Sequence, residues 1–130
     1  MDRSAVITPK DRARFTLMGA IGCVISRVYF NAPETPGEVH HLLNGGGRRR
    51  GHQATVYLHA WYHRGVPPLI GSRQLTKQEA TDRYGPSLAE SRPAFEARFG
   101  TDDDLLEMQN ALIDAYVAQI GPVMARRGAA

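Results

Sequence analysis

The fold is decided by residues 38–65, which read EVHHLLNGGGRRRGHQATVYLHAWYHRG. A short apolar segment with two adjacent histidines, 38–43, precedes a loop of glycines and arginines from Asn44 to Gly51. Glycine populates turn conformations without steric cost, so this loop is expected to be flexible. Residues 55–64 then predict a short helix that ends at Gly65. The stretch therefore predicts a strand, a basic loop and a helix.

Upstream, residues 21–30 are rich in β-branched and aromatic side chains, which favours a first strand. Residues 31–37 contain asparagine, two prolines and a glycine, so they predict a turn. The segment from Glu38 would then return beside the first strand. Residues 1–14 are polar and without periodicity, which predicts a loose arm.

The second half of the chain has a helical pattern. Thr76 and Glu79 predict a capping box at the start of a helix over 77–84. A second helix is expected over 87–99, bent near Pro93. The longest is expected over 101–120, with Asp102, Asp103 and Asp104 in its first turn and an end at Gly121-Pro122.

The length of 130 residues corresponds to one ordinary domain with enough chain to bury a core without disulfides. A single cysteine, Cys23, excludes an intrachain disulfide and a four-thiolate zinc site. The apolar stretch from Leu17 to Ile25 is too short to span a bilayer. We therefore expect no membrane partner and a cytoplasmic location. Cys23 has two interpretations, a buried small apolar residue or a zinc ligand.

The charge is unevenly distributed along the chain. The net charge is +3, but residues 1–75 hold ten basic and four acidic residues, a net +6, which leaves −3 for the remainder. This asymmetry favours a polyanion as the partner of the first half. The alternative is a solvated basic face.

All five histidines fall in one short window, at His40, His41, His52, His59 and His63. Imidazole both binds transition metals and acts as a base near neutral pH. His59 and His63 are spaced i, i+4, so on a helix both can face one metal ion. His40 and His41 would point to opposite faces of a regular strand, unless a bulge turns both inward. His52 has two interpretations, an exposed or anchoring residue and a supporting residue of the site.

This arrangement resembles the ββα-metal fold of HNH-type endonucleases, and within them the phage recombination-enhancement nucleases that act on DNA with RecA. The resemblance is carried by Gly22-Cys23, Glu38 to Leu42, Gly45 to Arg48, His52, Tyr57 to Gly65, Tyr84 to Ala89 and Phe95 to Gly100. It implies an α+β chain: a flexible arm over 1–18, a ββα-metal core over 19–66, a helical extension over 67–125 and a frayed tail over 126–130.

The resemblance also implies roles for individual residues. His40 and His63 match metal-ligand positions, and His41 matches the general base. Arg48, Arg49, Arg50 and Arg64 are expected to bind DNA phosphates. The implied cofactor is a divalent ion (zinc, magnesium or manganese), and the implied partners are DNA and a RecA-type filament in a bacterial host cell.

The chain departs from the family pattern at a structural zinc site. Ser26 stands at the partner position of Cys23, and His59 and Tyr62 stand in place of a second cysteine pair. Position 54 is alanine, so the middle asparagine of the HNH motif has no counterpart. Two hypotheses for His59 follow: it points to Cys23, which the family pattern favours, or it joins His63 as a third ligand, which helical phase favours.

The leading hypothesis is a metal-dependent, weakly sequence-specific DNA endonuclease in phage or prophage recombination. The alternatives are a non-catalytic nucleic-acid-binding accessory protein that keeps the fold, and a small structural metal-binding protein.

Overall fold

The computed structural model describes residues 6–44 and 46–129, and residues 122–129 by their backbone alone. In chain order the elements are α1 (Pro9–Ile21), α2 (Val24–Phe30), β1 (Glu38–His41), β2 (Thr55–Leu58), α3 (Ala60–Arg64), β3 (Leu69–Ile70), β4 (Arg73–Gln74), α4 (Lys77–Tyr84), α5 (Arg92–Phe99) and α6 (Asp102–Ala129). Helices combine with two small antiparallel sheets, which agrees with the α+β class expected from the sequence.

The first element is a helix and not a loose arm. Thr8 accepts a hydrogen bond from the Asp11 amide, Asp11 accepts one from the Thr8 amide, and Pro9 occupies the first helical position. α1 contacts α6 and β2. The expected arm over 1–18 is therefore wrong for residues 9–18, and residues 1–5 lie outside the described part of the chain.

Residues 24–30 form helix α2, where a strand was expected. Cys23 is its N-cap, and Asn31 ends it in a left-handed conformation with φ of 50°. Val24 and Ile25 are fully buried in the core. Packing therefore outweighs the strand preference of the β-branched side chains here.

The central hairpin pairs β1 with β2, not with an upstream strand. The strands are antiparallel, and the register runs without interruption from Glu38 opposite Leu58 to His41 opposite Thr55. The expected helix over 55–64 is thus wrong in its first half, since residues 55–58 form β2 and only Ala60–Arg64 is helical. Val56 and Leu58 are buried on one face of β2, which is the alternation of a strand.

The C-terminal half is largely as predicted. The capping box of Thr76 and Glu79 at α4 is confirmed. α5 begins later than expected, because Ser91 caps it and Pro93 lies in its first turn instead of bending it. The α6 backbone continues through Pro122 to Ala129, so the expected end at Gly121 and the frayed tail from Arg126 are not seen. Ala130 lies outside the described residues.

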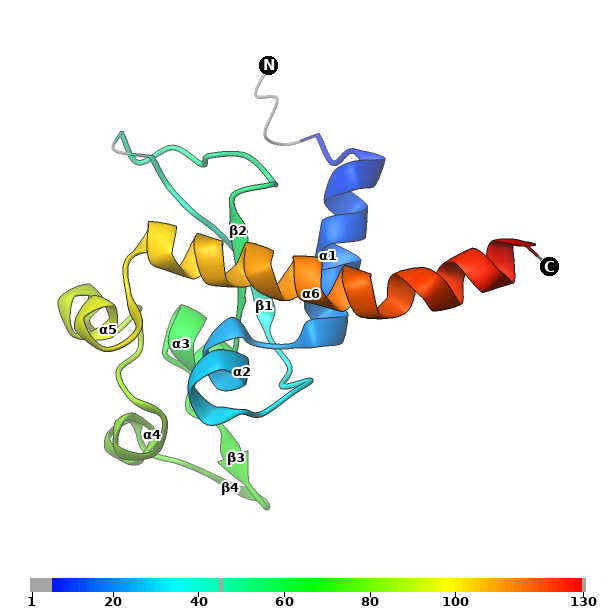
Figure 1. The fold of residues 1–130 in the computed structure, drawn as a ribbon. Helices are drawn as coiled ribbons and strands as arrows, with labels where there is room; N and C mark the ends of the chain where they lie inside the picture. Colours follow the sequence, from blue (N-terminus) through cyan, green and yellow to red (C-terminus); the bar gives the residue numbers. More distant parts are fainter. Residues whose placement is uncertain (1–5, 45, 130) are drawn as a thin grey trace.

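Figure 1 shows how these elements surround the hairpin. α6 crosses one side of the hairpin, α1 stands next to β2, and the long β1–β2 loop projects at the upper end. The core lies between the hairpin and the helices and includes Cys23, Trp61, Phe95, Phe99 and Leu105. No single helix of the described chain is long and apolar enough to cross a membrane; α1 and α2 together, bent by 41°, pass that test by length and composition.

Candidate active site

The two adjacent histidines of β1 lie on opposite faces of the hairpin. His40 pairs with Val56 and His41 with Thr55 in an unbroken register, so the structure shows no bulge that would turn both inward. Each imidazole meets a second histidine on its own face. The candidate site therefore consists of two histidine pairs, one on each face of the hairpin.

The first pair is His40 with His63. Their ring centroids are 4.9 Å apart and the ring planes are inclined at 63°. Glu38, two residues before His40 on the same face, accepts a hydrogen bond from His63 Nδ1 at 2.9 Å. Arg64 also donates to both carboxylate oxygens of Glu38. Glu38 thus orients the last two residues of α3 toward β1.

The electrostatics of this face keep Glu38 charged and His40 neutral. The hydrogen bonds from Arg64 lower the pKa of Glu38 to about 2. Burial, helped by the charge on His63, lowers the pKa of His40 to about 4. A neutral imidazole keeps a nitrogen lone pair at neutral pH, which is the form that binds a metal.

The second pair is His41 with His52. His41 Nε2 lies 2.9 Å from His52 Nδ1, so one nitrogen carries the proton and the other accepts it. Phe15 of α1 packs edge-on against both rings, with centroids 6.4 Å from His41 and 5.8 Å from His52. Burial, together with the positive charge of Arg49, lowers the pKa of His41. His41 is therefore neutral near pH 7.

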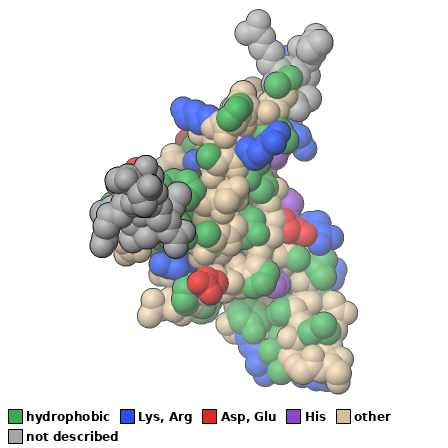
Figure 2. Space-filling model, turned by 90° about the vertical axis from the view of Figure 1, so that its right-hand side faces the viewer, with side chains coloured by type: hydrophobic (Ala, Val, Ile, Leu, Met, Phe, Trp, Pro, Cys, Tyr) green, Lys and Arg blue, Asp and Glu red, His purple; other side chains and the backbone are tan. Residues whose placement is uncertain are grey.

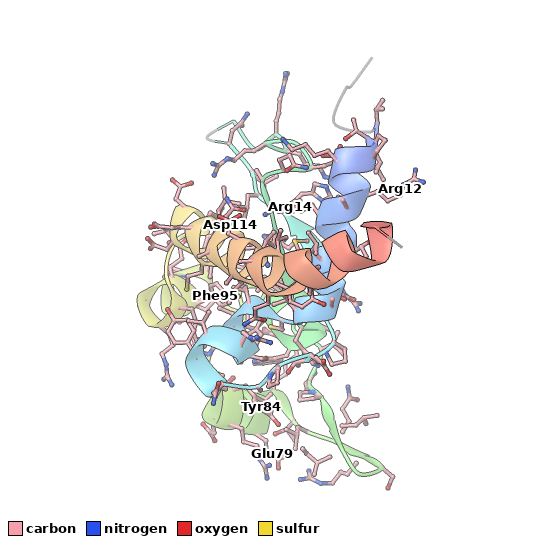
Figure 3. The ribbon with its side chains drawn as sticks, turned by 45° about the vertical axis from the view of Figure 1, so that its right-hand side comes forward. Arg12, Arg14, Glu79, Tyr84, Phe95 and Asp114 are labelled. Atoms are coloured by element: carbon pink, nitrogen blue, oxygen red, sulfur yellow. The ribbon has the colours of Figure 1, made fainter. Side chains whose placement is uncertain are left out.

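His52 is held from below by a buried network. Its side chain is only 8% exposed, and its carbonyl accepts a hydrogen bond from Thr55 Oγ1. The guanidinium of Arg14 donates to Thr55 Oγ1, to the Thr55 carbonyl and to Asn110 of α6. Figure 3 shows Arg14 on the inner side of α1. His52 is therefore buried and in contact with His41, and the exposed position that the sequence allowed is not seen.

His59 is not on the helix but is its N-cap. Its Nδ1 accepts a hydrogen bond from the Trp61 amide, and its backbone is extended, with φ −55° and ψ 149°. The i, i+4 argument for a shared site with His63 therefore fails. His59 lines a cavity of about 200 Å³ with Ser26 and Tyr62, three of the positions at which the resemblance to zinc-containing relatives suggested a structural zinc site.

Cys23 is fully buried in the hydrophobic core, the environment of a small apolar residue. Within the described chain no three His, Cys, Asp or Glu side chains are grouped so that they could hold a metal ion. The pair of His40 and His63 offers two nitrogen ligands, and the hydrogen bond from His63 Nδ1 to Glu38 leaves Nε2 for a metal. A carboxylate behind a histidine is the usual support of a metal-binding imidazole.

The four arginines expected to bind DNA differ in their surroundings. Arg50 forms an ion pair with Asp103 of α6 at 2.8 Å, and Arg64 is paired with Glu38. Arg48 and Arg49 are exposed, and neither forms an ion pair with any described residue. Two of the four are thus paired with carboxylates of the protein in this structure.

Comparison with known families identifies the chain. Residues 7–114 match the family described as recombination enhancement, RecA-dependent nuclease. The chain belongs to this family. Searches of curated proteins and of solved structures gave no match. As a member of this family, the protein is assigned to the RecA-dependent nucleases of recombination enhancement.

Sequence reasoning missed three residues of this candidate site: Glu38, Phe15 and Arg14. Glu38 was detectable, because positions i and i+2 of a strand share a face. Phe15 and Arg14 carried no usable signal, since α1 was not expected to be a helix against the hairpin. Their contacts to positions 41, 52 and 55 connect segments remote in sequence.

Proposed function

We propose that this RecA-dependent nuclease family member is a metal-dependent HNH-type endonuclease that hydrolyses DNA phosphodiester bonds with weak sequence preference. The observation that supports this most is the His40–His63 pair, in which Glu38 accepts a hydrogen bond from His63. The two histidines lie on a β-hairpin and on the helix that follows it. That order of elements is the one expected of a ββα-metal core. We also propose that it acts in phage or prophage recombination in the host cytoplasm.

His40 and His63 would hold the divalent ion, which when bound supplies Lewis-acid stabilisation of the charge on the phosphate and the leaving 3′ oxygen. Two protein ligands leave the remaining coordination positions to waters and substrate oxygens, as in phosphoryl-transfer sites, where the protein ligands of magnesium are carboxylates. Imidazole ligands suit zinc and other transition metals as well. The metal's identity is left to measurement.

His41 is the proposed general base. When its Nε2–H donates to His52 Nδ1, its own Nδ1 keeps a lone pair that accepts a proton from the attacking water. Among the described residues β1 pairs with β2 along one edge, and its other edge carries no strand. A phosphodiester lying along this open edge reaches both faces, and so both His40 and His41.

The exposed Arg48 and Arg49 are proposed to contact phosphates next to the cut. Contacts of this kind position DNA without reading its sequence, so cleavage should be weakly specific and sensitive to salt. His59 and Cys23 are not included among the catalytic groups.

The deciding experiment combines metal analysis with a plasmid nicking assay, with and without RecA, in Mg²⁺, Mn²⁺ or Zn²⁺. We expect His41→Ala to lower the cleavage rate by about 10²–10⁴-fold while DNA affinity is retained, because a general base contributes that much. His63→Ala should lower metal affinity as well. His59→Ala is the matched control and should still cleave at temperatures where it is folded.

Each other outcome has a defined meaning. Cleavage by His41→Ala within a few-fold of wild type would remove His41 from the base role. DNA binding with neither metal nor nicking would make the protein an accessory binding module. Metal binding without DNA affinity would make it a structural metal protein.

A further inference from the structure

Helix α1 lies directly beside His41. Phe15 contacts the rings of both His41 and His52. One turn earlier, Asp11 accepts a hydrogen bond from Gln53 Nε2 at 2.7 Å. The first two turns of α1 and the end of the β1–β2 loop thus flank the second histidine pair.

α1 also carries an exposed cation one turn before Phe15. Arg12 precedes Phe15 by three positions, so both lie on one side of the helix. Arg14 and Met18 occupy the buried side. Arg12 is exposed and forms no ion pair with a described residue. In Figure 3 it extends away from the helix, opposite to Arg14.

A second arginine without an ion pair to a described residue lies on the β1–β2 loop, between His41 and His52 in the chain. Arg49 is exposed and pairs with Leu43, two residues after His41, in an isolated antiparallel bridge. Figure 2 shows Lys and Arg side chains at the upper end of the molecule, with exposed histidine atoms next to them. Two exposed arginines without an ion pair to a described residue therefore come from the two elements that flank the second histidine pair, Arg49 from the loop and Arg12 from α1.

We propose that α1 forms the second half of the DNA-binding surface, with Arg12 and Arg49 contacting backbone phosphates on either side of His41. This inference rests on the proposed nuclease function. A guanidinium is always charged and binds phosphate through several donors, which suits a contact that must hold any DNA sequence. Two arginines on either side of His41 would hold a DNA strand against this proposed general base. Arg50 and Arg64 are less suited to this role, because each is already paired with a carboxylate.

The test is DNA binding measured without cleavage, in EDTA, by fluorescence anisotropy over a series of salt concentrations. The probes are a duplex and a single strand of the same sequence. We expect Arg12→Ala to reduce the log–log salt slope by about 0.9 on the duplex or about 0.7 on the single strand, the value for one lost phosphate contact. Arg49→Ala should do the same, and Arg12→Lys should keep most of the slope.

Arg83→Ala is the matched control, since Arg83 is an exposed arginine on α4 without an ion pair to a described residue. Its slope should equal that of wild type. An unchanged slope for Arg12→Ala, in a variant with wild-type thermal stability, would overturn the inference. If wild type binds and nicks DNA in that case, the proposed function stands alone. If wild type binds no DNA, both fall.

Cys23 allows a second readout. It is the sole cysteine and is fully buried, so a cysteine introduced at the surface can be labelled selectively. A fluorophore on Arg12→Cys should change intensity when DNA is added, whereas one on Arg83→Cys should not. Equal responses at the two positions would contradict a DNA contact at α1.

Discussion

Glu38 shows how a single carboxylate can organise this site. It accepts hydrogen bonds from His63 Nδ1 and from Arg64, and its low pKa keeps it charged over the whole physiological range. Because a carboxylate only accepts, the proton of His63 is held at Nδ1. The sequence contains the signal for Glu38 in its spacing from His40, but nothing in it indicates that Arg64 would share the carboxylate instead of facing DNA.

His59 is expected to matter for stability and not for catalysis. His59→Ala removes the side chain that accepts from the Trp61 amide. Loss of an N-cap typically costs about 0.5–2 kcal/mol, so we expect a decrease of that order in the free energy of unfolding. Urea denaturation measures it.

His59→Asn is the matched variant, since asparagine caps helices well. It should recover most of the stability. The result that would contradict the structural role is a loss of metal affinity in His59→Ala as large as that of His63→Ala.

At the scale of elements, α1 is fastened to the hairpin by Arg14. Arg14 is 8% exposed, and its guanidinium donates to Thr55 of β2 and to Asn110 of α6. Burial lowers the pKa of Arg14, but the group remains charged. A buried charge is tolerated only where its donors are satisfied, and this residue joins three elements.

We expect Arg14→Lys to destabilise the fold although it keeps the charge. Lysine cannot reproduce the forked donors, and each buried hydrogen bond to a charged group contributes about 1.5–3 kcal/mol. Thermal and urea denaturation provide the measurement. Arg12→Lys, the same substitution two residues earlier at an exposed position, serves as control and should leave stability unchanged. Equal stability of the two variants would show that the Arg14 network is dispensable.

The elements that could be predicted are those with local signals. The capping box of α4 lies within four consecutive residues, and the short apolar segment around His40 was correctly expected to be a strand. α2 could not be predicted, because its Val and Ile side chains favour a strand until packing against α6 and β2 is known. Because a strand was expected in place of α2, β1 was assigned the wrong partner. The separation of His40 and His41 onto two faces was predictable, since it depends only on the geometry of a strand.

At the scale of the whole molecule, acid should destabilise the metal-free protein in two stages. The folded pKa of His40 is about 4, below its ordinary value of 6.5, and burial also lowers those of His41 and His59. The unfolded chain therefore binds more protons between about pH 6.5 and pH 4, so stability falls as pH falls through this window, by up to about 1.4 kcal/mol per pH unit for each such group.

Below about pH 4 the protonation of carboxylates causes the further loss of stability. The pKa values of Glu38 and Asp11 are about 2, so the stability they contribute is present above their ordinary values and is lost as pH falls toward 2. Urea denaturation in the presence of a chelator, at pH 7.5, 5.5 and 4.5, tests the first stage. His40→Gln should show a shallower decrease between pH 6.5 and 4. An equally steep decrease would mean that other groups carry the effect.

The uninterrupted register of β1 has a genetic consequence. Residues on a strand alternate between faces, so removing the codon for Val39 would place Glu38 next to His40 and therefore on the opposite face. Removing either histidine codon gives the same chain, which keeps Glu38 and one imidazole on a shared face but loses the second histidine. Removing one codon from the loop at Arg48 or Arg49 shortens the loop and leaves the residues of β1 and β2, and therefore their pairing register, unchanged. Single-codon deletions should therefore be tolerated in the loop and should abolish activity at the four positions of β1, Glu38–His41.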